Sequence, residues 1–263
     1  MDLPGLYDEL DRLYGEPGAD VAGFLREALR RARLAGDGRT CVAVANELGS
    51  VLRLRGELAE SEALYEEVLS GLRKLGAGDE ERARALINLG DVYVAQGRHE
   101  SAVEAFDRAE ALLGSGEEHP YEVSAVCNNR SAALRGLGRF SAARRDLRRA
   151  ARLLESVPNS EGRRATNAIN LAQVLMDEGR LDEAEEAIAP ALEAYRVLCG
   201  GRDVHRPHAL ATAAKIAYLR GRYAEAEGLY REAAVAMRDK LGDAPNVAAL
   251  EREAKRMRAL GRS

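Results

Sequence analysis

Six glycines recur along this chain at almost constant spacing, and that spacing limits what the chain can fold into. Gly15, Gly56, Gly97, Gly138, Gly179 and Gly221 are separated by 41, 41, 41, 41 and 42 residues. A period between about 20 and 50 residues is typical of a solenoid, in which no single unit can bury its apolar face and neighbouring units must stack. The sequence therefore predicts a stacked array of similar units.

The composition favours helices in each unit. The 263 residues include no Trp and only 5% aromatic residues, while Ala, Leu, Glu and Arg, which suit helices, dominate. The 39 Lys and Arg residues are outnumbered by 43 Asp and Glu residues, so the chain has no general attraction for nucleic acid or an anionic membrane. No apolar run reaches the ~18 residues that cross a bilayer. We expect an all-α protein without a membrane partner, and the charge disfavours nucleic acid.

The residues that flank each glycine repeat as well. The helix expected before the glycine carries a small residue, which lets its partner helix approach closely, and the helix expected after it carries a large apolar residue. The glycine itself is expected to end the first helix in a left-handed conformation. The small residues are Gly49, Gly90, Ser131, Ala172 and Ala214, and the large ones are Tyr65, Phe106, Leu147, Ile188 and Tyr230.

This pattern resembles the tetratricopeptide repeat family, whose unit is a helix-turn-helix. The junctions from Leu113-Gly114 to Glu118-His119-Pro120 and from Leu241-Gly242-Asp243 to Pro245 are similar to the kinesin-light-chain type, whose period exceeds the usual ~34 residues. The resemblance implies a right-handed α-solenoid of about six helix-turn-helix units plus a C-terminal capping helix. We expect one domain over 1–263, with a divergent first repeat at 1–38, repeats at 39–78, 79–118, 119–159, 160–200 and 201–244, and the capping helix at 245–263.

Three asparagines stand at one position of successive repeats. Asn88, Asn129 and Asn170 are 41 residues apart on predicted first helices, although asparagine is an indifferent helix former. A carboxamide offers both donors and acceptors, as a peptide main chain does. The resemblance places first helices on a concave face and implies that these asparagines bind a peptide there. The alternative is that each asparagine bonds a neighbouring repeat or is solvated. The same face is expected to carry Asn46, Arg53, Arg84, Asp91, Asn128, Arg135, Gln173, Met176, Lys215 and Tyr218.

A second candidate surface is a strip of arginines on the helix expected after Gly138. Such a strip could bind an acidic partner or a phosphate backbone. The alternative is a solvated convex face balanced by acids of neighbouring helices, because runs of charged residues on a helix are usually exposed to solvent. The strip consists of Arg144, Arg145, Arg148, Arg149 and Arg152.

Motifs of catalysis and of cofactor binding are missing from the sequence. It has no phosphate-binding loop, zinc-protease helix or nucleophile elbow. Asp203, His205 and His208 would make an incomplete metal site, and Pro207 interrupts the helical spacing of the two histidines, so we interpret the segment as a repeat junction. Cys41, Cys127 and Cys199 show no metal-binding or redox spacing and are expected to be packed, reduced thiols. We expect neither metal nor cofactor.

These observations predict a non-catalytic adaptor or scaffold that binds a peptide or protein segment in its concave groove. The first residues lack a basic region followed by an apolar core, so a cytoplasmic location is expected. Two alternatives stay open. One is self-assembly into a homo-oligomer through the end repeats, and the other is polyanion binding through the Arg144 to Arg152 strip.

Overall fold

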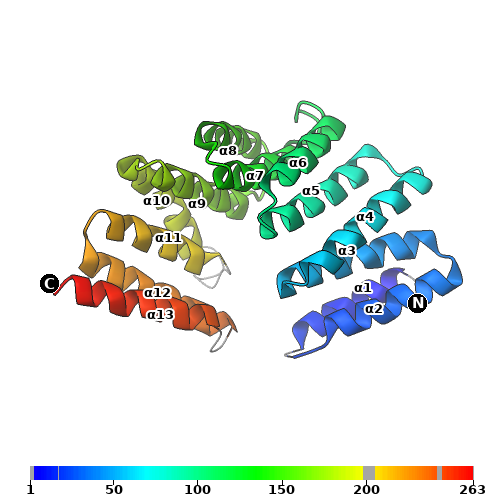
Figure 1. The fold of residues 1–263 in the computed structure, drawn as a ribbon, viewed down its shortest axis with the longest axis horizontal. Helices are drawn as coiled ribbons and strands as arrows, with labels where there is room; N and C mark the ends of the chain where they lie inside the picture. Colours follow the sequence, from blue (N-terminus) through cyan, green and yellow to red (C-terminus); the bar gives the residue numbers. More distant parts are fainter. Residues whose placement is uncertain (1–2, 17, 198–204, 242–244, 263) are drawn as a thin grey trace. The chain divides into compact units, whose positions relative to one another are not determined.

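The computed structural model describes residues 3–16, 18–197, 205–241 and 245–262, and those residues form thirteen α-helices and no strand. The chain divides into two compact units, residues 1–137 and 138–263. The all-α prediction is confirmed (Figure 1). The expected single domain over 1–263 stays a prediction.

The first unit holds seven helices: α1 (Leu3–Gly15), α2 (Val21–Ala35), α3 (Gly38–Arg55), α4 (Leu58–Lys74), α5 (Asp79–Ala95), α6 (His99–Leu113) and α7 (Pro120–Gly136). Helix α3 packs on α4 and α5 on α6, as the predicted repeats require, and α4 packs on α5. The first helices also contact one another in chain order, α3 with α5 and α5 with α7. Side chains of successive first helices can therefore interact across the repeats.

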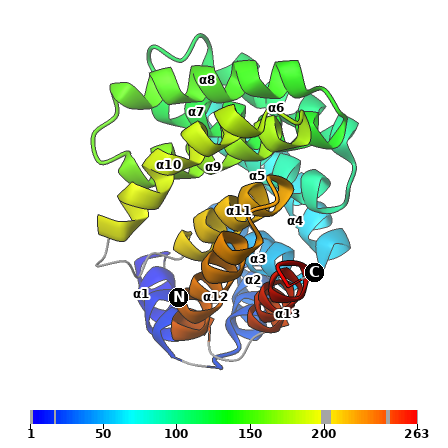
Figure 2. The ribbon, with the colours of Figure 1, turned by 90° about the vertical axis from the view of Figure 1, so that its left-hand side faces the viewer.

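The second unit holds six helices: α8 (Phe140–Glu155), α9 (Glu161–Asp177), α10 (Leu181–Val197), α11 (Arg206–Leu219), α12 (Tyr223–Leu241) and α13 (Pro245–Leu260). The pairs are α9 with α10 and α11 with α12, and the first helices α9 and α11 also touch. Figure 2 shows α11, α12 and α13 side by side. The predicted repeat of residues 119–159 spans the boundary, with α7 in one unit and α8 in the other.

The recurring glycine does end the first helix in five of the six positions. Gly56 and Gly97, for example, have φ of 81° and 74°, a region that a side chain disfavours. The prediction is wrong at Gly15, which is the last residue of α1, whereas Gly18 has φ of 80°. The turn of the divergent first repeat is longer, so its left-handed residue lies three positions later.

Close helix pairing depends on the small residues of the first helices. A methyl group on Gly49 would lie 2.9 Å from the Tyr65 ring, and one on Gly90 would lie 2.6 Å from the Phe106 ring. Both rings are fully buried. The aromatic side chain of the second helix thus fills the space that the glycine leaves, as the repeat pattern predicts.

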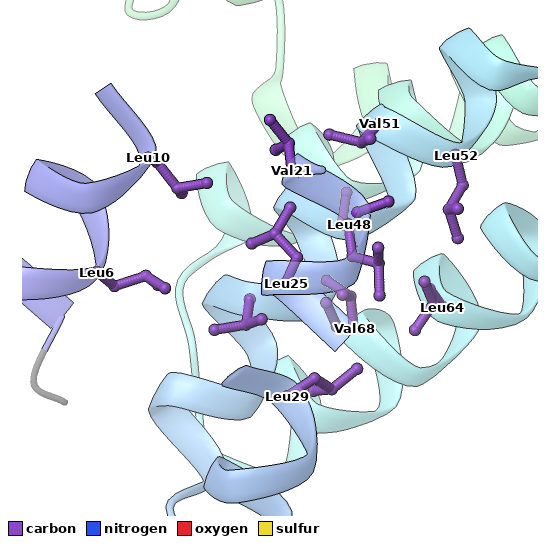
Figure 3. Packing of buried hydrophobic residues seen from close by; sticks show 14 of the residues in the cluster. Leu6, Leu10, Val21, Leu25, Leu29, Leu48, Val51, Leu52, Leu64 and Val68 are labelled. Atoms are coloured by element: carbon purple, nitrogen blue, oxygen red, sulfur yellow. The ribbon is translucent and has the colours of Figure 1, made fainter. Parts of the chain in front are cut away.

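The divergent first repeat shares its apolar core with the next repeat. Figure 3 shows leucine and valine side chains from α1, α2, α3 and α4 gathered in one cluster. Leu6 and Leu10 of α1 and Leu25 of α2 are nearly inaccessible to solvent. Helices α1 and α2 therefore contribute to the core of the next repeat, while the assignment of residues 1–38 as a divergent repeat stays a prediction.

Helix α13 packs on α12 as the predicted capping helix. Val247, Ala254 and Met257 are buried, while the rest of the helix carries charged side chains. Arg238 of α12 pairs with Glu251 at 2.7 Å. An apolar inner face with a charged outer face closes a stack of repeats.

The structure also bears on membrane-spanning helices and on the cysteines. No helix among the described residues is long and apolar enough to cross a membrane. Cys127 is a buried free thiol and Cys41 a half-buried one, whereas Cys199 lies outside the described residues.

Candidate functional site

The asparagines belong to a position that we call the ladder position, nine residues before each turn glycine. Glu47, Asn88, Asn129, Asn170 and Thr212 occupy it in the five regular repeats. These residues lie on the first helices α3, α5, α7, α9 and α11. Thr212 is buried and the other four are half-buried, so those four side chains can reach both a neighbouring helix and the surface.

In the first unit, ladder asparagines tie successive first helices together. Asn88 of α5 donates from Nδ2 to Oδ1 of Asn46 on α3 at 3.1 Å. Asn129 of α7 donates from Nδ2 to Oδ1 of Asp91 on α5 at 2.9 Å, and its own Oδ1 accepts from Asn128 at 3.4 Å. Asn88 and Asn129 therefore each make one hydrogen bond to a neighbouring repeat, which is the alternative to peptide binding that the sequence left open.

The second unit contains the same kind of tie. Gln173 of α9 donates from Nε2 to Oγ1 of Thr212 on α11 at 3.4 Å. Asp91 and Gln173 both stand six residues before a turn glycine, and each bonds the ladder residue of the following repeat. The contact thus recurs at equivalent positions in both units. The third predicted asparagine, Asn170, is half-buried on α9.

Half-buried carboxyl groups lie beside these amides. Burial raises the pKa of Asp91 to about 6, and the positive charge of Arg53 and the hydrogen bond from Asn129 oppose that rise. Burial also raises the pKa of Glu47, against the effect of its Asn46 neighbour. Because water is partly excluded, charge and hydrogen bonding carry more weight on this face than on an open surface.

The predicted basic residues of this face are largely balanced by the protein itself. Arg53 faces Asp91, and Arg84 forms an ion pair with Glu80. Arg135 is half-buried on α7. Two of the three arginines expected on this face in the first unit therefore lie near an acidic residue of the same chain.

In the second unit the predicted Lys215 and Tyr218 come together. The Lys215 ammonium lies 5.1 Å from the centre of the Tyr218 ring. Arg256 of α13 lies 5.2 Å from the same centre and donates to the Tyr218 hydroxyl at 3.2 Å. Arg256 is also 3.3 Å from Glu253, so of these two cations Lys215 is the one that can attract the carboxylate of a ligand.

A cavity of about 580 Å³ opens where α3 and α5 begin. Tyr7 of α1, Asn46 of α3 and Arg84 of α5 line it, and Leu72 of α4 forms part of its apolar wall. Asn46 also accepts the Asn88 hydrogen bond. The cavity therefore continues into the ladder residues, and its size is within the range of ligand sites.

The five arginines of the strip differ in their exposure and in their ion pairing. Arg144 places Nε 3.0 Å from Oε2 of Glu178, and these side chains are only 17% and 15% exposed. Arg180 is 3.6 Å from the same carboxylate oxygen. Arg145, Arg148 and Arg152 are exposed and Arg149 is half-buried. Arg144 is thus engaged between α8 and the turn after α9 instead of lying on an open strip.

Some residues of this face escaped the sequence analysis. Glu47 and Thr212 stand at the ladder position, and counting back from every turn glycine would have found both. Tyr7 and Tyr14 of α1 have pKa values raised by burial and by the negative charge of Glu47, but α1 carries too little of the repeat pattern to align them.

The histidine segment gives no metal centre among the described residues. His205 and His208 have ring centres 6.5 Å apart, while Asp203 lies outside the described part of the chain. Across residues 3–16, 18–197, 205–241 and 245–262, no three His, Cys, Asp or Glu side chains gather as metal ligands.

Several solved structures share this fold. The crystal structure of BtubC (BKLC) from P. vanneervenii has a TM-score of 0.69 and 19% identity, covering 86% of this chain and 92% of that one. A putative kinesin light chain of Podospora anserina with TPR-like repeats has a TM-score of 0.58 and 20% identity over 76% of this chain and 96% of its own. NprR in complex with its cognate peptide NprX has a TM-score of 0.68 and 12% identity over 88% and 66%.

Comparison with curated protein sequences gives no match. Family models described as tetratricopeptide repeat match residues 39–115, 123–157 and 163–239, well over half of the chain. These matches agree with the helix pairs, the turn glycines and the kinesin-light-chain-like neighbours. The chain belongs to the tetratricopeptide repeat family.

Proposed function

We propose that this protein is a non-catalytic cytoplasmic adaptor that binds an extended peptide or protein segment along the face of its first helices. The family and its fold support protein or peptide binding. The observation that carries the proposal is the row of half-buried amides and carboxyl groups on α3, α5 and α7, next to a cavity that Asn46 lines.

The hydrogen bonds between repeats leave capacity for a ligand. A carboxamide has two N–H donors and an oxygen acceptor. Within the described residues Asn88 uses one donor, for Asn46, so its second N–H and its Oδ1 can meet a peptide main chain. The bond to Asn46 holds the amide in place, which reduces the entropy lost on binding.

The spacing suits an extended ligand. Packed helices lie about 10 Å apart, and an extended peptide advances ~3.3 Å per residue. Each first helix would therefore meet about every third residue of the peptide. On this proposal Asn88 and Asn129 contact main chain in the first unit, with Asn128, Arg53, Arg84 and Arg135 beside them. Asn170, Gln173, Lys215 and Tyr218 are the proposed contacts in the second unit.

The test is a peptide selected from a random 12-residue display library on the full chain, whose Kd is then measured by fluorescence anisotropy. Asn88→Ala removes the inter-helix bond and the proposed peptide contact. Asn46→Ala removes the same inter-helix bond but leaves the Asn88 side chain, so it is the matched control. We expect Asn88→Ala to weaken binding about fivefold or more relative to Asn46→Ala, because a lost hydrogen bond to a desolvated partner costs ~1 kcal/mol or more.

Equal affinity of the two variants would show that Asn88 acts only between helices. Circular dichroism must show unchanged helicity in both. The mass in solution tests the self-assembly alternative, because a species well above 28.5 kDa would favour a homo-oligomer.

A further inference from the structure

A second hollow in the first unit lies between successive second helices and not between first helices. It has a volume of about 550 Å³ and is lined by α4, α5 and α6. Helices α4 and α6 both pack on α5, as Figure 1 also shows. We call this hollow the outer groove. It shares no lining residue with the cavity beside Asn46.

The floor of the outer groove is apolar. Leu86 and Leu89 of α5 are each 3% exposed, and the half-buried Leu69 of α4 and Leu112 of α6 flank them. A groove of this kind gains free energy when an apolar side chain covers it, at about 25 cal/mol for each Å² removed from water. Its volume is within the range of ligand-binding sites.

The rim of the outer groove carries arginines that lack an acidic partner. Arg73 at the end of α4 and Arg108 on α6 are both exposed. Within the described residues neither forms a hydrogen bond or an ion pair. Their neighbours differ, since Arg33 pairs with Glu67 at 2.5 Å and Arg98 with Glu62 at 2.7 Å.

The remaining charges of the rim leave it positive. Arg82 pairs with Asp79 at 2.9 Å. Glu66 is the one acid among the lining residues, and its charge acts on the hydroxyl of Tyr93, whose pKa is raised by burial and by Glu66 and lowered by Arg108. With Arg82 already paired, Arg73 and Arg108 against Glu66 around an apolar floor favour an anionic group on the occupant.

We propose that the outer groove binds a partner-protein segment that presents a large apolar side chain next to a carboxylate. The apolar side chain packs on Leu86 and Leu89, and the carboxylate pairs with Arg73 or Arg108. An apolar centre surrounded by a charged, exposed rim is the layout of a protein–protein interface. Helix α5 contributes to both surfaces, but the outer groove shares no lining residue with the cavity on the first-helix face. The chain would therefore hold one partner on each surface, which is what an adaptor needs.

The experiment uses the full chain and a phage-displayed library of 12-residue peptides. Selection on the wild-type protein is paired with counter-selection on Arg73→Glu/Arg108→Glu, so that peptides retained depend on the rim. These two residues are exposed, and the variant should fold normally. We expect enrichment of sequences with Leu, Ile, Phe or Trp within one helical turn of Asp or Glu.

The Kd of one enriched peptide, measured for several variants, then tests the apolar floor and the arginine rim of the groove one at a time. Ala111→Phe, at an exposed lining position on α6, should fill the groove and weaken binding about tenfold or more. Arg73→Gln and Arg108→Gln should each weaken peptide binding about three- to tenfold. When the acidic residue of the peptide is replaced by Gln, the wild type and these two variants should bind it with the same Kd. Arg148→Gln, an exposed arginine on α8, is the matched control and should have no effect.

Three outcomes would overturn the proposal. They are the absence of enrichment over the counter-selected variant, enrichment without an acidic residue, and unchanged affinity in Ala111→Phe. Self-association that Ala111→Phe abolishes would also overturn it, because a second copy would then occupy the groove. Asn88→Ala should leave affinity for this peptide unchanged, so a failure here is distinct from a failure on the first-helix face.

Discussion

Asn129 on α7 donates a hydrogen bond to Asp91 on α5, 38 residues earlier in the chain, at 2.9 Å. In the second unit Gln173 and Thr212 join α9 to α11 at the corresponding positions. In both contacts the ladder residue bonds the residue that stands six positions before the preceding turn glycine. A polar pair between two first helices specifies their offset, because a shift of either helix breaks the bond.

Asp91→Asn should remove a pH dependence of stability. The pKa of Asp91 is raised to about 6 in the folded protein, from about 4 in an unfolded chain. The folded state then binds the proton more tightly, so this group's contribution to stability is complete below pH ~4 and is lost as the pH rises through 6. We expect the variant to exceed the wild type by roughly 1–2 kcal/mol at pH 7.5, and to match it at pH 4, in urea unfolding. A constant difference between the two proteins at every pH would contradict this.

Gly90→Ala should destabilise the second regular repeat. The added methyl group would lie 2.6 Å from the Phe106 ring, and the buried ring has no room to move. Overpacking of this kind costs about 1–3 kcal/mol. Gly228→Ala, in α12 with nothing within 4 Å of the added carbon, is the control and should stabilise by ~0.5–1 kcal/mol. Thermal unfolding midpoints followed by circular dichroism compare the two, and a midpoint of Gly90→Ala at or above wild type would refute the close-packing argument.

Gly97→Ala and Gly15→Ala should differ although the sequence treats the two glycines alike. Gly97 has φ of 74°, a conformation that costs a residue with a side chain roughly 1–2 kcal/mol. Gly15 ends α1 without a positive φ, so alanine there should be neutral or slightly stabilising. Chemical denaturation of both variants measures the difference, and equal losses of stability would mean that Gly15 also serves as a left-handed turn residue.

Arg144→Gln should destabilise the second unit more than Arg148→Gln. Arg144 and Glu178 are mostly buried and 3.0 Å apart, so removing the arginine leaves a carboxylate in a poorly solvated site. Arg180, 3.6 Å from that carboxylate, compensates part of the loss, and we expect about 1–3 kcal/mol. Arg148 is exposed and its replacement should cost less than ~0.5 kcal/mol. Similar unfolding midpoints for the two variants would place Arg144 among the solvated residues of the strip.

The helix pairs could be predicted from the sequence because they repeat. A period of 41 residues aligns Gly49 with Gly90 and Tyr65 with Phe106, and each pair forms the same close contact. Repetition gives several independent copies of one signal, so the turn, the small residue and the large apolar residue were all predictable. The first repeat lacks that redundancy, and its left-handed residue was misplaced at Gly15 instead of Gly18.

The candidate site was predictable in position but not in its bonds. The spacing of Asn88 and Asn129 placed both on first helices, as the structure has them. Their partners, Asn46 and Asp91, are set by the offset between neighbouring helices, which no pattern within one repeat encodes. The same holds for Glu178, which takes Arg144 out of an otherwise exposed strip.

The sequence by itself determined the helical class, the repeat length and the residues that each repeat must bury, because local propensity and periodic burial are written along the chain. Only the tertiary structure decided which polar side chains are already bonded and which remain for a partner. Arg33 and Arg73 both stand in the last turn of a helix, yet Arg33 pairs with Glu67 of another helix, whereas within the described residues Arg73 has no such partner. The difference arises because ion pairing depends on distances between atoms, and those are set only when the helices pack.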